Sequence, residues 1–368
     1  MKIGIDGTLL SLNYPCGTKH YAEQLLSALS KIDKKNEYII FSKQDVKIPR
    51  AKNFRLKLIP KFLPLLRRQF FLAYLAKKEK VDLLHFLSPT GSLFLKNIKV
   101  VTTVHDIDFN LIYPKNKTLP MLYERVYSEL IRNYTFKKTC HFITNSNFTN
   151  KQLRLFLTKI KMKAQITHTP LAPSSKFKII RKTLKNDKKN FLCMGDFSPR
   201  KNIEKVIEAY SLLSKGLKRN YFLKIVTTHN APKDIFLSKA EYLGIRRNIK
   251  LIESPSLKRL VTLFNQATAF IYPSLYEGFG IPILEAMACQ CPVITSNIGA
   301  TKEVAGGNAL LINPRNSNSI KNAMEEIIKN KRLSSTMKRK GIDWSKKFSW
   351  EKTAEKTLKV YEITLLRD

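Results

Sequence analysis

Short runs of β-branched and aromatic residues alternate with longer amphipathic runs along this 368-residue chain, and this alternation constrains the fold more than any other feature. Runs such as EYIIFS are typical of buried strands, and runs such as HYAEQLLSALSKI are typical of helices packed on a sheet. Strands that alternate with helices form parallel sheets covered by helices. The sequence therefore predicts an α/β fold, with ligand bound at the carboxyl ends of the strands.

The alternation occurs in two series, which indicates two doubly wound domains. In the first series we expect strands at 2–7, 37–42, 81–86, 99–106 and 141–146, with helices at 20–32, 65–78 and 122–136. In the second we expect strands at 190–197, 222–228, 248–254, 268–274, 292–297 and 309–314, with helices at 203–213, near Ala240, at 257–267, at 282–290 and from Ser319 onward. The charged stretch RKTLKNDKKN between them is interpreted as a linker. The predicted domains are 1–172 and 188–347, and 348–368 is predicted to form a C-terminal helix.

Basic residues dominate the charge of the chain, with 66 Lys and Arg against 28 Asp and Glu and a net charge of +38. Such a charge favours polyanionic partners, meaning nucleic acid, an anionic membrane surface or phosphorylated substrates. Two segments are especially basic: 57–80, which contains PLLRRQFFLAYLA, and 329–347, which we interpret as a solvated helix face. The charge identifies a kind of partner but no reaction.

The cysteines and the apolar runs bear on localisation. The five cysteines lack a CxxC pair, which favours reduced, buried thiols in a cytoplasmic protein over a disulfide framework or a zinc site; they are Cys16, Cys140, Cys193, Cys289 and Cys291. The opening MKIGIDGTLLSL is interrupted by Asp6 and is interpreted as a first strand, not a signal peptide. Because no apolar run reaches ~18 residues, we expect any membrane contact to be peripheral, on the inner face of the cytoplasmic membrane.

Two glutamates in the stretch PSLYEGFGIPILEAMACQCPVITS carry the strongest chemical signal. A buried strand is expected to end just before this stretch, and Pro282 suits the first turn of the helix that follows. Glu277 then lies in the loop and Glu285 in the first helical turn. Gly278 and Gly280 let the backbone approach a ligand, and free N–H groups at a helix start bind anions. The pattern predicts a diphosphate site at which carboxylates accept hydrogen bonds from ligand hydroxyls.

The string E-G-F-G-x-P-x-x-E-A-M-A resembles the donor-site signature of glycosyltransferase family 4, whose members are retaining enzymes with the two-domain GT-B fold. The resemblance implies two Rossmann-like domains that face each other across a cleft, with a C-terminal helix that crosses back to the first domain. It implies that Glu277 binds the donor sugar and acts in catalysis, and that Glu285 binds the ribose. Phe279 and Ile281 join the two glycines as donor-binding positions.

Other segments extend the resemblance over nearly the whole chain. MGDFSPRKNIEKVIEAY is similar to the family's phosphate-binding loop. This similarity implies that Arg200 and Lys201 bind the donor diphosphate. YPCGTKHYAEQLL is similar to the Gly-containing loop that reaches the donor phosphate, matched by Gly17 and Thr18. TTVHDIDF is similar to the segment with a sugar-positioning histidine, matched by His105.

Two positions depart from the family pattern. Asp196 stands where many members have an arginine, so the second phosphate contact is expected to fall to Arg200 beside Lys201. Gln290 replaces a glycine at a helix end that favours a left-handed residue, so we expect local strain or an altered turn there, away from the chemistry.

The resemblance implies transfer of a sugar from a nucleotide diphosphate sugar, with no cofactor and no metal, to a glycan or lipid-linked acceptor in lipopolysaccharide or surface polysaccharide synthesis. GDP-mannose is the expected donor, because the HD and PRKN variants look like the mannosyltransferase branch. The 57–80 segment is a candidate for docking on an anionic membrane, against the alternative of an ordinary packed helix. The alternatives for the whole chain are a basic nucleic-acid-binding protein, not favoured because no nucleic-acid motif is evident, and another GT-B enzyme, such as a phosphorylase or a sugar-nucleotide epimerase.

Overall fold

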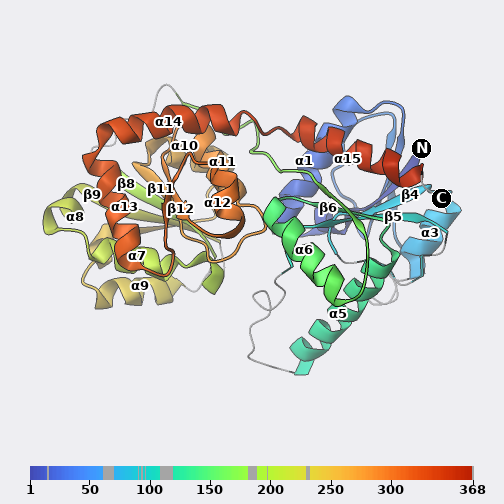
Figure 1. The fold of residues 1–368 in the computed structure, drawn as a ribbon, viewed down its shortest axis with the longest axis horizontal. Helices are drawn as coiled ribbons and strands as arrows, with labels where there is room; N and C mark the ends of the chain where they lie inside the picture. The colour runs from blue at the N-terminus through green and yellow to red at the C-terminus, as the bar shows by residue number, and fades with distance from the viewer. Residues whose placement is uncertain are drawn as a thin grey trace. The chain divides into compact units, whose positions relative to one another are not determined.

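Two sets of strands and helices build the protein, as a computed structural model shows (Figure 1). The structure describes residues 1–14, 16–60, 70–89, 91, 92, 94, 95, 97–107, 119–180, 189–196, 198–228 and 233–366. By its internal contacts the chain divides into a first unit of Met1–Leu171 with Ser349–Asp368, and a second unit of Ala172–Phe348. Each unit contains one parallel sheet with helices on both faces, which confirms the predicted pair of Rossmann-like domains.

The sheet of the first unit has seven parallel strands in the order β3-β2-β1-β4-β5-β6-β7. They are β1 (Lys2–Asp6), β2 (Glu37–Ser42), β3 (Phe54–Leu58), β4 (Leu83–Phe86), β5 (Lys99–Val104), β6 (His141–Thr144) and β7 (Gln165–His168). The main helices are α1 (Gly17–Ile32), α3 (Leu72–Lys78), α5 (Leu119–Lys138), α6 (Asn147–Lys159) and α15 (Trp350–Leu365), and the short 3-10 helix η1 (Gly7–Ser11) follows β1. As the resemblance implied, the C-terminal helix α15 belongs to this unit, where it packs on α1.

The sheet of the second unit has six parallel strands in the order β10-β9-β8-β11-β12-β13. They are β8 (Lys189–Met194), β9 (Tyr221–Thr227), β10 (Ile249–Glu253), β11 (Ala269–Tyr272), β12 (Val293–Ser296) and β13 (Leu310–Ile312). The helices are α7 (Ile203–Ser211), α8 (Lys215–Asn220), α9 (Lys233–Tyr242), α10 (Leu257–Gln266), α11 (Ile281–Ala288), α12 (Gly299–Ala305), α13 (Ser317–Lys329) and α14 (Lys331–Ser345), with 3-10 turns η3 (Pro199–Lys201) and η4 (Arg246–Asn248). In Figure 1, α7, α9 and α13 lie on one side of this sheet and α10, α11 and α14 on the other.

The strand order reverses once in each sheet, between β1 and β4 in the first unit and between β8 and β11 in the second. In doubly wound sheets, ligands bind outside the carboxyl ends of the strands at such a reversal, because the flanking loops diverge there. The predicted site residues lie in the loops after β1, β5, β8 and β11 or in the helical segments that follow those loops. The topology therefore gives both units a binding edge at the expected place.

The edge strands β3 and β7 were not predicted. FRLKL and QITH are short, and most of their residues are only partly buried, so neither shows the apolar run that marks a central strand. The predicted helix at 65–78 is described only from its later part, as α3, because 61–69 lie outside the described residues. The predicted linker at 181–190 also lies mostly outside them, and its last two residues, Lys189 and Asn190, open β8.

Two further expectations need correction. Cys140 is exposed and Cys16 only partly buried, so the buried thiols are those of Cys193, Cys289 and Cys291. The basic 329–347 segment is not wholly solvated, because one side of α14 packs on α11, with Met337 buried. Among the described helices, none combines the length and the apolar character needed to cross a membrane.

Candidate active site

The loop that leaves β11 runs from Pro273 to Gly280, where α11 begins. Gly280 has φ +105° at the N-terminal boundary of α11, in the left-handed region that glycine adopts without strain. Pro282 lies in the first turn, as predicted. Glu285 is the fifth residue of α11, so its predicted place in the first turn is wrong and it belongs to the second turn.

A second loop follows β8 and places Arg200 and Lys201 beside the loop after β11. Asp196 accepts hydrogen bonds from the backbone N–H (3.1 Å) and the hydroxyl (2.6 Å) of Ser198, so this departure from the family pattern acts as a turn residue. Asn202, in the left-handed region at φ 57°, donates from its amide to the carbonyls of Pro273 (3.1 Å) and Pro314 (2.6 Å). Asn202 therefore ties the basic loop to the loop after β11.

Glycine at position 195 is required by the basic loop itself. A β-carbon on Gly195 would lie 2.8 Å from Cβ and 3.1 Å from Cγ of Lys201. The lysine stem crosses the end of β8 through the space that a side chain would take. Gly195 thus sets the direction in which Lys201 reaches the site.

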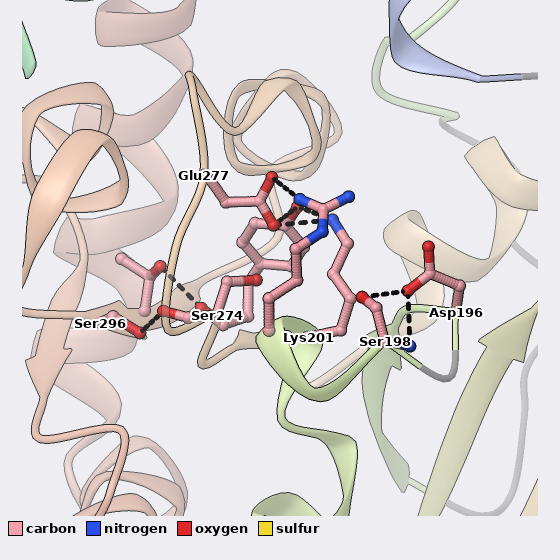
Figure 2. A network of polar contacts seen from close by, with 9 residues as sticks. Asp196, Ser198, Lys201, Ser274, Glu277 and Ser296 are labelled. Carbon is pink, nitrogen blue, oxygen red and sulfur yellow. Dashed lines mark hydrogen bonds and ion pairs between the residues drawn. The ribbon is translucent and has the colours of Figure 1, made fainter. Parts of the chain in front are cut away.

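Arg200, Lys201 and Glu277 form one ionic cluster, together with Tyr272 (Figure 2). Nζ of Lys201 donates to Oε1 of Glu277 (2.7 Å) and to the Tyr272 hydroxyl (2.8 Å), and that hydroxyl donates to the same Oε1 (2.9 Å). Nη1 of Arg200 lies 3.1 Å from Oε2 of Glu277. The structure therefore brings together three of the predicted site residues, and it adds Tyr272.

Burial and charge act against each other in this cluster. Burial disfavours the ionised Glu277 carboxyl, but the charges of Lys201 and Arg200 outweigh it and hold its pKa below the ordinary value. Burial also disfavours the Lys201 ammonium, and Tyr272 and Glu277 reverse the effect, so the pKa of Lys201 lies above its ordinary value. Burial and Glu277 together raise the pKa of Tyr272 to about 12. At neutral pH the cluster carries two positive charges and one negative charge, a net charge that attracts an anion.

Glu285 differs from Glu277, because no ion pair or hydrogen bond reaches its carboxyl from the described residues. It is 9% exposed, and burial raises its pKa to about 8. A carboxyl group without partners in an apolar setting binds its proton tightly. Ligand hydroxyls that donate to this group would replace the missing partners and favour the carboxylate.

The remaining donor-binding positions around α11 have different settings. The Phe279 side chain is buried and makes an edge contact with Phe348 (6.3 Å between ring centroids), so only its backbone is suited to meet a ligand. Ile281 is the partly buried first residue of α11. Gly278 lies in the loop between Glu277 and α11.

In the first unit, Gly17 and Thr18 open α1. The boundary residue Cys16 makes no side-chain cap, so the N–H groups of the first turn point outward without a side-chain acceptor. A β-carbon at Gly17 would meet nothing within 4 Å, so packing within the protein does not require glycine there. An open, uncapped helix start fits the predicted contact with a phosphate.

His105 follows β5 and lies at the same edge of the sheet. Its Nε2 lies 2.9 Å from the carbonyl oxygen of Leu87, and because a carbonyl only accepts, Nε2 carries the proton. Burial lowers the pKa of His105 to about 4, although the bond to Leu87 acts in the opposite direction. His105 is therefore neutral at pH 7, with Nδ1 as a hydrogen-bond acceptor.

Three residues of this site were not predicted from the sequence: Gly195, Asn202 and Tyr272. Gly195 directly follows β8 and Asn202 directly precedes α7, and a glycine after a strand and an asparagine before a helix were usable signals. Tyr272 gave no signal, because it ends the apolar run AFIY and was interpreted as core.

The fold and the site define the class: a GT-B protein with a cluster of basic side chains between the loops after β8 and β11 of its second unit. Residues 17–162 match the family described as Glycosyltransferase Family 4, and residues 175–344 match Glycosyl transferases group 1. The chain is a glycosyltransferase and belongs to family 4 of these enzymes.

Individual proteins agree with this assignment. The O-antigen chain mannosyltransferase B of Escherichia coli is 28% identical over 276 residues, which are 72% of this chain and 70% of that protein. The O-antigen chain mannosyltransferase RfbU of Salmonella typhimurium is 29% identical over 233 residues, 61% of this chain and 60% of its own length. The sucrose-phosphate synthase of Thermosynechococcus elongatus has the same fold, with a TM-score of 0.79 over 98% of both chains at 19% identity.

Proposed function

We propose that the chain transfers mannose from GDP-mannose, with retention at the anomeric carbon, to a glycan or lipid-linked acceptor in lipopolysaccharide or O-antigen synthesis. The names of the two similar mannosyltransferases support the sugar and the pathway. The observation that carries the proposal is the cluster of Arg200 and Lys201 with Glu277, which concentrates positive charge where a diphosphate leaving group would lie.

In the proposed reaction, the bond between the anomeric carbon and the diphosphate oxygen breaks as the acceptor hydroxyl oxygen bonds to that carbon from the same face, and the hydroxyl proton passes to the leaving diphosphate. The leaving diphosphate gains negative charge, and the preorganised cations of Arg200 and Lys201 stabilise it. Within the second unit, the N–H groups at the start of α11 would add to this field through the 278–281 backbone. In the first unit, the start of α1 at Gly17 and Thr18 is a separate proposed contact for a donor phosphate. We propose that the basic side chains and backbone N–H groups take the place of a metal ion at the leaving group, so that transfer proceeds without one.

The sugar and the ribose are assigned to the acceptor groups of the site. Glu277 would accept hydrogen bonds from the sugar hydroxyls while its charge keeps Lys201 and Arg200 in place. Glu285 would accept from the ribose hydroxyls, which supply the partners that its buried carboxyl lacks. His105 would accept at Nδ1 from a hydroxyl of the transferred sugar, because Nε2 is occupied by Leu87.

The proposed cellular site is the cytoplasmic side of the membrane, with docking through the 57–80 segment. Much of that segment, including Arg67 and Arg68, lies outside the described residues. In the described part of the segment, Phe70 stacks on Phe94, with 4.1 Å between the ring centroids; Phe70, Phe94 and Tyr74 are 45%, 48% and 58% exposed. Exposed aromatic rings beside lysines favour the surface of an anionic bilayer. Lys57 does not add to this surface charge, because it pairs with Glu79 at 2.9 Å.

Flotation with anionic liposomes tests the docking. Changing Arg67 and Arg68 to Glu is expected to reduce the bound fraction, and unchanged binding would refute the docking. Because the enzyme site is elsewhere in the chain, transfer to a soluble acceptor analogue should be unaffected.

A screen of nucleotide sugars by thermal shift and by product analysis tests the function. GDP-mannose is expected to raise the melting temperature and to give free GDP together with an extended acceptor, and Lys201→Met is expected to abolish both effects. Sugar phosphate as product would indicate a phosphorylase, and an altered nucleotide sugar would indicate an epimerase. If no nucleotide sugar shifts the melting temperature, the proposed function is wrong.

A further inference from the structure

A chain of hydrogen bonds crosses the core of the first unit from α15 to β5. The Tyr361 hydroxyl on α15 lies 2.6 Å from Nδ1 of His85 on β4, and Nε2 of His85 lies 2.8 Å from the hydroxyl oxygen of Thr103 on β5. The Tyr21 hydroxyl on α1 lies 3.0 Å from the same threonine oxygen. All four side chains are at most 1% exposed. A polar chain so deeply buried must be internally satisfied, because each unpaired group would cost about 1–3 kcal/mol.

The direction of the hydrogen bonds follows from the partners. Among the described residues, the Tyr361 hydroxyl has His85 as its acceptor, so it donates to Nδ1. The proton of His85 is then on Nε2, which donates to Thr103. Burial lowers the pKa of His85 to about 3, and the nearby His105 acts in the same direction. These hydrogen-bonded side chains are therefore neutral at physiological pH, and the donors and acceptors of the two bonds at His85 are fixed.

The chain of hydrogen bonds ends at Tyr21, whose ring contacts the imidazole of His105. The rings of Tyr21 and His105 meet edge to face, with centroids 4.7 Å apart and planes inclined by 77°. The Leu87 carbonyl holds the proton on Nε2, and the Tyr21 ring limits rotation of the imidazole plane. Tyr21 is itself held at its far end by Thr103. The orientation of His105 thus depends on groups that extend to the C-terminal helix.

We propose that Tyr361, His85, Thr103 and Tyr21 are positioning residues, which together hold the His105 imidazole so that Nδ1 faces the transferred sugar. The inference rests on the proposed function, in which His105 accepts a hydrogen bond from that sugar. The four residues act through His105, so their loss should lower the rate of transfer and leave donor affinity nearly unchanged. A displacement of a contacting group by a fraction of an ångström is enough to slow a reaction by about tenfold.

Neighbouring threonines on β5 supply a matched test. Thr103 belongs to the chain of hydrogen bonds from Tyr361 to Tyr21. The hydroxyl of Thr102 instead lies 2.8 Å from that of Thr139, outside this chain of hydrogen bonds. Both are fully or almost fully buried, and replacement by valine keeps the shape and removes one hydroxyl. We expect Thr103→Val to lower kcat about tenfold with the donor KM within about twofold, and Thr102→Val to change neither, at a similar loss of melting temperature.

A second readout is independent of activity. In ¹⁵N spectra of histidine-labelled protein, His105 should show a protonated Nε2 and a bare Nδ1 in the wild type and in Thr102→Val. In Thr103→Val, its signals should move toward an average of the two tautomers. Tyr361→Phe removes the hydroxyl at the other end of these hydrogen bonds and should move the His105 signals in the same direction by a smaller amount. If Thr103→Val does not fold, Tyr361→Phe takes its place in the test.

The outcomes separate the two proposals. Unchanged kcat and unchanged His105 signals in Thr103→Val, or equal losses of kcat in both threonine variants, would overturn the positioning role while transfer itself stands. If the wild type transfers no sugar, the proposed function fails, and the ¹⁵N comparison still decides whether the chain orients His105.

Discussion

The two units hold their candidate site residues by opposite electrostatic means. In the second unit, Lys201, Arg200 and Glu277 are ionised and bind one another, and the pKa values of Lys201 and Glu277 move toward the charged forms. In the first unit, His85 and His105 are kept neutral by burial. The second unit thus holds fixed charge suited to the proposed anionic leaving group, and the first holds neutral donors and acceptors suited to the hydroxyl groups of the proposed sugar. An enzyme that separates a charged leaving group from a neutral sugar needs both kinds of surface.

The largest loss of transfer activity is expected when a charge is removed from the cluster of the second unit. Lys201→Met keeps the stem that packs against Gly195 and removes the ammonium. We expect kcat/KM to fall by about 100-fold or more, because loss of one preorganised group that stabilises a transition state has an effect of this size. Steady-state kinetics with the preferred donor measure it. Lys205→Met is the control, because Lys205 is a lysine of α7 that pairs with Glu208 (2.6 Å) and should not affect transfer. Equal losses in both variants would contradict the assigned role of Lys201.

The units should also differ in how their stability depends on pH. His85 and His105 have lowered pKa values, so the unfolded first unit takes up protons first as the pH falls below about 6.5. The first unit should therefore lose about 1.4 kcal/mol per pH unit for each histidine between pH 6.5 and their folded pKa values. Hydrogen exchange of amides in the first unit, corrected for the intrinsic pH effect, measures the slope, and His85→Gln should reduce it by one proton.

The second unit should show the opposite slope over part of that range. Glu285 has a pKa raised to about 8, so the folded unit keeps a proton that the unfolded chain releases above about pH 4.5. Its stability should rise as the pH falls from 8 toward 4.5, and Glu285→Gln should remove that rise. Glu277 adds nothing in this window, because its lowered pKa affects stability only below pH 4.5. Parallel slopes in the two units would contradict the comparison.

A smaller effect, on donor affinity, is expected from a substitution at the start of α1 in the first unit. Gly17→Ala adds a methyl group where the protein leaves open space, so stability should be unchanged or slightly higher. If a phosphate lies against this helix start, the methyl group should raise the donor KM by about tenfold, or about 1.4 kcal/mol. Binding of the nucleotide diphosphate by calorimetry measures it. Undiminished affinity would remove Gly17 from the donor site.

The smallest effect concerns the scaffold beneath both surfaces. Gln290 has φ 60°, which confirms the strain expected where the family has glycine. Gln290→Gly should stabilise the protein by about 1 kcal/mol in chemical denaturation without changing kcat, since a left-handed conformation costs a side chain roughly 1–2 kcal/mol. A changed kcat would show that this turn is coupled to the site.

How far the sequence predicted the molecule depends on the range of the forces involved. Central strands were found because burial on both faces leaves an apolar run, whereas β3 and β7, at the edges, carry no such run. Arg200, Lys201 and Glu277 were recognised from their motifs, but their mutual pairing was not, because 76 residues separate Lys201 from Glu277. Glu285 was placed one turn too early, since the pattern predicted a helix start without fixing its first residue. The chain from Tyr361 to Tyr21 joins four elements and leaves no local pattern at all.

The place of α15 in the first unit has a consequence for synthesis of the protein on the ribosome. The first unit receives Tyr361 and the rest of this helix only after all of Ala172–Phe348 has been translated, which takes on the order of ten seconds or more at ~5–20 residues per second. Until then, the face of α1 that α15 covers is exposed and His85 lacks its donor, whereas the second unit is continuous in sequence and can fold as soon as it emerges. The nascent first unit therefore passes through a stage in which it offers a vacant helix-binding groove, and chaperone capture should concentrate on that stage.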